Sequence, residues 1–248
     1  MDLYLVVDCA AILGRKVGEG DEIPTGLERT LASSAGVALA EAEVNTRNQG
    51  GSIPLHGAAA NDNLAAIESL VAAGAEVNAR DEGGLTPLHR AAWPNDNPAI
   101  IEALVAAGAE VNARGGDGLT PLHRAAWSND NPAIIEALVA VGAEVNARGG
   151  DGFTPLHVAA TATVSPTIIG ALVAAGAEVN ARDGDDLTPL HVATMVPASP
   201  TIIEALLDAG ADATARDAEG KTPWDYAEGR AEFRGTDVYW RLNDGRFR

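Results

Sequence analysis

Aromatic residues and cysteine are scarce in this sequence of 248 residues. Phe, Trp and Tyr together make up 4 % of the chain, so we do not expect a core built from large aromatic side chains. The single cysteine, Cys9, cannot form an internal disulfide or supply a metal cluster, which fits a reducing compartment. We therefore predict a cytoplasmic protein.

Positive charge is also scarce. The chain has 17 basic groups against 35 acidic ones, which gives a formal net charge of -18. Such a balance opposes binding to the phosphate backbone of nucleic acid, because like charges repel. It favours a protein partner that is basic or neutral.

Long apolar runs are missing as well. No stretch approaches the roughly 20 apolar residues that a membrane span needs, so we predict no membrane insertion. The opening MDLYLVVDCAAILG is apolar enough to resemble a signal peptide, but Asp2 replaces the usual positive flank and Asp8 interrupts the apolar run. Export is therefore the less favoured alternative for this segment.

The dominant feature is an internal repeat. Residues 81–114 recur as residues 115–148 with five changes, and the motif T-P-L-H-x-A occurs in four copies. These copies begin at Thr86, Thr120, Thr154 and Thr188, with a variant start at Ile53 and a divergent one at Thr222. Repeats of this period indicate a solenoid. The W-x-x-L-G-x-x-Y pattern of tetratricopeptide repeats is missing.

Each repeat contains the signals of two helices and a turn. Thr86 and Pro87 begin a short helix, in which Leu88, Ala91 and Ala92 fall on one face. A second helix begins at Asn97-Pro98, and its predicted core stripe is Ile101, Leu104 and Val105. A glycine then ends this helix, and a polar hairpin leads to the next repeat.

On these motifs, residues 48 to about 228 resemble an ankyrin-repeat array. The resemblance implies an all-α solenoid of helix-turn-helix units with hairpin loops, capped at both ends. We divide the chain into an N-terminal segment with a degenerate half-repeat cap at 1–47, repeats at 48–80, 81–114, 115–148, 149–182 and 183–216, and a divergent C-terminal capping repeat at 217–248. An appended element at 1–47 and a second binding surface at 217–248 are the alternatives.

All five histidines occupy the same slot of the repeat: His56, His89, His123, His157 and His191. The family resemblance implies a structural role, in which each imidazole bridges its own threonine and the adjacent hairpin. A row of metal ligands is the alternative, but one zinc ion needs several ligands about 2 Å away, and the histidines fall in successive repeats.

No motif in the sequence points to catalysis. With the histidines assigned to structure, no Ser-His-Asp or Cys-His arrangement can be assembled. The acidic loop at 183–186 lacks the spaced oxygens of a calcium site, and the Gly-rich turns at 115–118 and 149–152 lack the lysine of a phosphate loop. We therefore predict no enzyme activity, no catalytic residue, no metal and no cofactor.

The resemblance implies binding to another protein through the hairpin tips and the exposed ends of the first helices. The candidate binding residues vary along the chain, from arginine and tryptophan in the central repeats to smaller apolar groups later: Arg90, Trp93, Arg124, Trp127, Thr161 and Met195. Val158, Val192 and Thr194 belong to the same predicted surface. Alternatively, the two tryptophans pack on their neighbours.

We interpret the chain as a monomeric, non-catalytic scaffold for a protein partner. Two alternatives remain open at this point. The first is a regulatory or targeting subunit of an enzyme, and the second is an engineered or recently duplicated array selected mainly for folding.

Overall fold

The computed structural model describes residues 41–93, 95–128, 130–161, 165–196 and 200–245. The predicted half-repeat at 31–40 and the remainder of the chain before it, Cys9 included, lie outside the described residues. Within the described ranges the regular elements are all helices and none is a strand, so the all-α prediction is confirmed.

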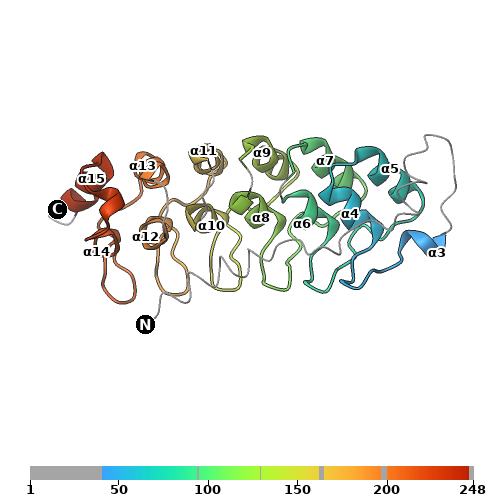
Figure 1. The fold of residues 1–248 in the computed structure, drawn as a ribbon, viewed down its shortest axis with the longest axis horizontal. Coiled ribbons are helices and arrows are strands. Elements are labelled where there is room, and N and C mark those ends of the chain that lie inside the picture. Colours follow the sequence, from blue (N-terminus) through green and yellow to red (C-terminus); the bar gives the residue numbers. More distant parts are fainter. Residues whose placement is uncertain (1–40, 94, 129, 162–164, 197–199, 246–248) are drawn as a thin grey trace. The chain divides into compact units, whose positions relative to one another are not determined.

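The helices are short and most of them come in pairs (Figure 1). The first helices of the pairs are α4 (Pro54–Ala60), α6 (Pro87–Ala91), α8 (Pro121–Ser128), α10 (Pro155–Thr161), α12 (Pro189–Met195) and α14 (Pro223–Ala227). The second helices are α5 (Leu64–Ala72), α7 (Pro98–Ala106), α9 (Pro132–Ala140), α11 (Pro166–Ala174) and α13 (Pro200–Asp208). The remaining elements are α3 (Glu41–Val44), the 3-10 helix η1 (Ala231–Phe233) and α15 (Asp237–Gly245).

The first helices begin as the T-P-L-H motif predicts. In α6, Thr86 has an extended backbone and Pro87 is the first helical residue, where a missing N–H costs nothing. His89 completes a capping box, because its ring accepts the backbone N–H of Thr86. The cap therefore uses an imidazole where glutamate or glutamine is usual.

The second helices begin at polar caps and end at glycine. The side chain of Asn97 accepts the backbone N–H of Ala99 at 3.1 Å, and Pro98 follows the cap directly. Gly108 comes just after α7 with a φ of +96°, a left-handed conformation that disfavours any side chain. Capping thus limits α7 to a little over two turns.

The core stripe of α7 differs by one residue from the predicted one. Ile101 and Leu104 are fully buried as predicted, but Ile100 is also fully buried and Val105 is only half-buried. At roughly 100° per residue, Ile100 and Ile101 flank Leu104 while Val105 lies at the edge of the stripe. On α6, Leu88, Ala91 and Ala92 are fully buried as predicted.

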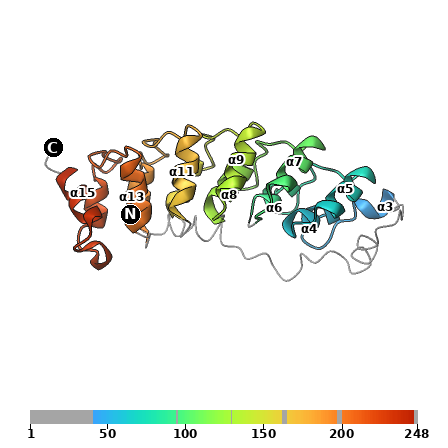
Figure 2. The same ribbon diagram turned by 90° about the horizontal axis from the view of Figure 1, so that it is seen from above.

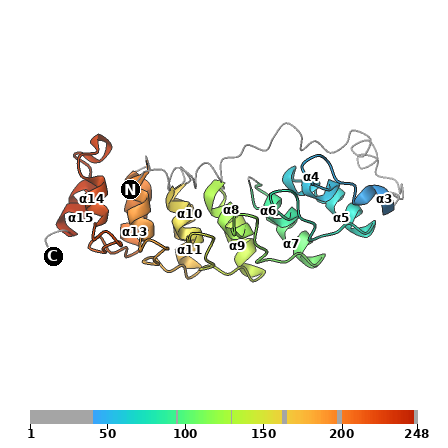
Figure 3. The ribbon, with the colours of Figure 1, turned by 90° about the horizontal axis from the view of Figure 1, so that it is seen from below.

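The described chain divides into two compact units. In the N-terminal unit, residues 41–125 and 133–144, α4 packs on α6 and α5 packs on α7. Figure 3 shows the first pair of these, and Figure 2 shows the second. Neighbouring hairpins are joined by backbone hydrogen bonds, such as that from the N–H of Gly116 to the carbonyl of Gly83 at 2.8 Å.

The C-terminal unit comprises residues 126–132 and 145–245 of the described chain. Here α12 packs between α10 and α14, and α11 packs on α13. The unit is closed by α15, which contacts both α13 and α14 (Figure 1). Val238 and Leu242 of α15 are completely buried.

Candidate functional site

Within each unit, the histidine slot joins neighbouring repeats. In every copy the ring Nδ1 accepts the backbone N–H of the cap residue, at 3.1 Å for His89 and 3.2 Å for His191. The ring Nε2 then reaches a carbonyl of the following repeat, Leu119 for His89 at 3.1 Å and Lys221 for His191 at 3.1 Å. The same pair of bonds occurs at His56 and His157, and His123 makes the cap bond.

These bonds fix the tautomer of the ring. A carbonyl oxygen can only accept, so Nε2 of His89 carries the proton and Nδ1 is left to accept the amide of Thr86. Burial lowers the pKa of His89 to about 4 and also lowers the pKa of His56 and of His191. Both ring nitrogens of His89 are thus engaged in hydrogen bonds within the protein.

Arg90 and Arg124 do not lie where the sequence interpretation put them. The side chain of Arg124 is 7 % exposed and its Nη2 is bonded to Asp117, while Arg90 is 15 % exposed and bonded to Asp81 at 2.7 Å. The expectation that these arginines belong to the exposed ends of the first helices is wrong, because each hairpin offers a carboxylate seven or nine residues earlier in the chain. They tie the first helix to its own hairpin.

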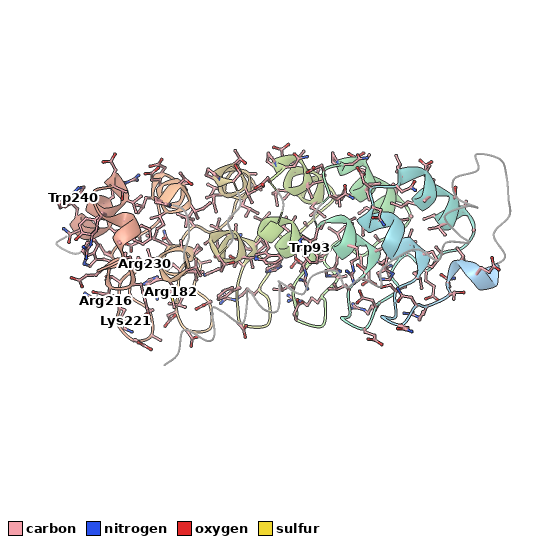
Figure 4. The ribbon with its side chains drawn as sticks, in the orientation of Figure 1. Trp93, Arg182, Arg216, Lys221, Arg230 and Trp240 are labelled. Atoms are coloured by element: carbon pink, nitrogen blue, oxygen red, sulfur yellow. The ribbon has the colours of Figure 1, made fainter. Side chains whose placement is uncertain are left out.

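The two tryptophans are half-buried. Trp93 follows the last residues of α6, and Trp127 lies near the end of α8. Figure 4 shows Trp93 at the end of its short helix. Because the two belong to different compact units, their side-by-side arrangement stays a prediction.

Fewer residues of the predicted binding surface are accessible in the later repeats than we expected. Thr161 and Met195 are half-buried at the ends of α10 and α12, and the hydroxyl of Thr161 donates to the carbonyl of Val158 at 2.7 Å. Val158, Val192 and Thr194 are at most 1 % exposed. They are core residues rather than surface ones, because they fall on the buried faces of α10 and α12.

Charged groups gather at the hairpins. Arginines that recur once per repeat are exposed there. Several donate to their own hairpin tips: Arg80 bonds the carbonyl of Gly84 at 3.0 Å, and Arg182 that of Asp186 at 3.2 Å. Arg182 and Arg216 lie in this region in Figure 4. We did not predict these exposed arginines from the sequence, although the repeated V-N-A-R pattern indicates their position. Carboxylates are exposed beside it, among them Glu82, Asp151 and Asp185.

These features define the class of protein. The described chain consists of stacked helix pairs joined by bonded hairpins, which is the organisation of a helical repeat protein. In the described residues no helix is long and apolar enough to cross a membrane, and no group of three or more His, Cys, Asp or Glu side chains is placed to hold a metal ion.

The family is shown by sequence comparison. Residues 31–115 and 94–183 match the family model for ankyrin repeats in 3 copies, and residues 185–218 match the model for a single ankyrin repeat. The chain therefore belongs to the ankyrin-repeat family. No curated protein matches it at a significant level. Ankyrin repeats are generally modules of protein–protein interaction and are typically non-catalytic.

Proposed function

We propose that this chain is a non-catalytic, monomeric scaffold of the cytoplasm that binds one protein partner through its hairpin tips and the ends of its first helices. The observation that carries the proposal is the half-buried tryptophan at the first-helix end, where Trp93 and Trp127 occupy the same place in successive repeats. Tryptophan contributes much of the energy of protein interfaces. Thr161 and Met195 occupy the corresponding helix ends in the next repeats.

The ion pairs give the arginines an indirect part in this surface. Arg90 bonds Asp81 of its own hairpin, so the helix that carries Trp93 is held against the hairpin tip. Arg124 holds the first residues of α8 to Asp117 in the same way. Their contribution to the partner is therefore to position helix and hairpin, since their charges are already compensated.

The charge of the surface favours a basic or neutral partner over nucleic acid. The formal net charge is -18, and exposed carboxylates stand at the hairpin tips of both units, such as Glu82 and Asp185. Association with a basic protein should therefore be fast at low salt and slower as salt is added. The opposite dependence would contradict the assignment of partner charge.

Affinity capture with a double variant tests the proposal. Trp93→Ala/Trp127→Ala should lose a saturable partner that the parent chain retains, while its denaturation midpoint falls little. The matched control is Glu68→Ala/Glu102→Ala, which changes exposed residues of the second helices α5 and α7 and should retain the partner. A large fall in stability with unchanged affinity would instead assign the tryptophans to packing. Turnover of a small molecule by the purified chain would overturn the non-catalytic assignment.

A further inference from the structure

Trp240 is the most exposed large apolar side chain in the described part of the protein. Of its surface, 57 % is open, and none of the other large hydrophobic residues described there is classed as exposed. It lies on α15, at the C-terminal end of the described chain and away from the hairpin tips (Figure 4). An exposed tryptophan is a candidate for contact with a partner, because tryptophan is among the residue types that contribute most to interface energy.

The packing of α15 does not need the indole. Val238 and Leu242 are fully buried and, at a separation of four residues, share the face that contacts the preceding helices. Trp240 is two residues from each, so it falls on the opposite side of the helix. Val238 and Leu242 therefore form the apolar face that packs α15 on the preceding helices, and Trp240 is not part of that face.

The indole is nevertheless held in place. Its ring meets the ring of Tyr239 edge to face with 5.3 Å between centroids, and Tyr239 meets Trp224 in the same manner at 4.7 Å. Trp224 is only 3 % exposed, so this chain of rings anchors the exposed indole to the core. A side chain that is already ordered loses less conformational entropy when a partner covers it.

Negative charge surrounds the indole on its helix. Asp237 and Asp244 precede and follow Trp240 by three and four residues, so both share its face, and both are exposed. The one cation of α15, Arg241, is bonded to Asp208 of α13 at 2.7 Å. On the helix face that carries the indole, the exposed charged groups of α15 are therefore the two carboxylates.

We infer that Trp240, together with Asp237 and Asp244, is a docking point for a basic segment of a partner protein. An arginine or lysine of that segment stacks on the face of the indole, and the two carboxylates pair with the cations beside it. Trp is the best ring for a cation–π contact, and the contact is electrostatic. This surface is separate from the hairpin tips and goes beyond the proposed scaffold function.

A peptide titration of the full chain tests the inference. The probe is a capped tetra-arginine peptide at physiological ionic strength, followed by calorimetry and by tryptophan fluorescence. Trp240→Ala should weaken binding about 3-fold to 5-fold, the factor that corresponds to an exposed cation–π contact. Trp240→Phe should weaken it less, because it keeps an aromatic face. Asp237→Asn/Asp244→Asn should also weaken it several-fold.

The matched control separates a defined site from the overall acidity of the chain. Glu68→Gln/Glu102→Gln removes the same two negative charges from exposed positions of α5 and α7 and should change affinity less than the aspartate pair does. Equal losses in both double variants, or unchanged binding by Trp240→Ala, would overturn the inference. Concentration-dependent self-association that disappears in Trp240→Ala would overturn it too, because the occupant would then be a second copy of the chain. If Trp240→Ala unfolds, the binding measured with Trp240→Phe and with Asp237→Asn/Asp244→Asn tests the inference instead.

Discussion

Asp225 accepts both the backbone N–H and the hydroxyl of Thr222, each at 2.8 Å, in the slot that earlier repeats give to histidine. A carboxylate can accept at this cap as an imidazole does, but it has no proton to donate onward. The slot thus keeps its local function and loses its link to a following repeat. This is the chemistry expected of a repeat covered by α15 rather than by another copy.

Removal of this cap should lower stability. We expect Asp225→Ala to reduce the free energy of unfolding by about 1 kcal/mol, because the backbone N–H and the hydroxyl of the cap residue Thr222 lose their acceptor. Chemical denaturation measures the change. Asp225→Asn keeps a side-chain oxygen and should lose less, and an equal loss in the two variants would assign the effect to charge instead.

The histidine slot should make stability depend on pH. Burial lowers the pKa of His89 to about 4, below its ordinary 6.5, so the unfolded chain binds the proton more readily. Stability should be full above about pH 6.5 and fall as the pH drops towards 4, by at most about 1.4 kcal/mol per pH unit from this residue. Between pH 7 and pH 5 the decline measured by denaturation should be smaller in His89→Ala than in the parent chain. An identical slope would contradict it.

The same variant should also be less stable at neutral pH. His89→Ala leaves the amide of Thr86 and the carbonyl of Leu119 without their imidazole partner, which should cost about 1 to 3 kcal/mol. We expect a similar loss for His123→Ala, whose ring is fully buried and accepts the amide of Thr120 at 3.1 Å. An unchanged midpoint in either variant would contradict the structural role.

The buried ion pair of α8 should show strong coupling. Arg124→Val leaves the carboxylate of Asp117 without its guanidinium and should cost about 1 to 3 kcal/mol. Burial lowers the pKa of Arg124, so the pair is partly desolvated and its members depend on each other. Arg124→Val/Asp117→Asn should recover part of the loss in a double-mutant cycle, because valine fills this slot in the next two repeats. Additive losses would indicate that the two side chains act independently.

Two glycines should respond in opposite directions to alanine. Gly170 lies within α11 and is exposed, and an added Cβ would meet nothing within 4 Å. Gly170→Ala should therefore raise stability by about 0.5 to 1 kcal/mol. Gly108→Ala is the control with equal space but a φ of +96°, and it should lower stability. A gain at both positions would mean that backbone conformation is not the deciding factor.

The repeat organisation could be predicted from the sequence because its signals are local. Thr86-Pro87 and Gly108 determine where helices begin and end through caps and left-handed backbone, and these depend on a few neighbouring residues. The width of the buried face of each helix could not be predicted to the residue. Val105, which was predicted to be part of the core stripe, is only half-buried. The spacing of apolar residues predicts which face of a helix is buried. It does not predict how far a neighbouring helix covers the edge of that face.

The exposure of charged residues could not be predicted from the repeat pattern alone. Arg90 and Arg124 follow the histidine slot, where we expected exposed side chains. Both instead form ion pairs with carboxylates of their own hairpins. That contact depends on hairpin geometry, and the two partners sit at different hairpin positions, Asp81 and Asp117. The sequence offered residues 217–248 as an alternative binding surface without singling out Trp240, since only the burial of Val238 and Leu242 shows which side of α15 remains exposed.

The histidine hydrogen bond between repeats is directional, because the donor lies in the earlier repeat and the acceptor in the later one. His89 donates forward to Leu119, and His56, His157 and His191 donate forward in the same way. If repeats are deleted from the C-terminal side, the ring N–H of the last histidine loses its carbonyl acceptor. If they are deleted from the N-terminal side, a carbonyl is uncovered and water can bond to it at little cost. Two deletion series of equal length should thus uncover different groups at the new end of the array, a ring N–H in one and a carbonyl in the other.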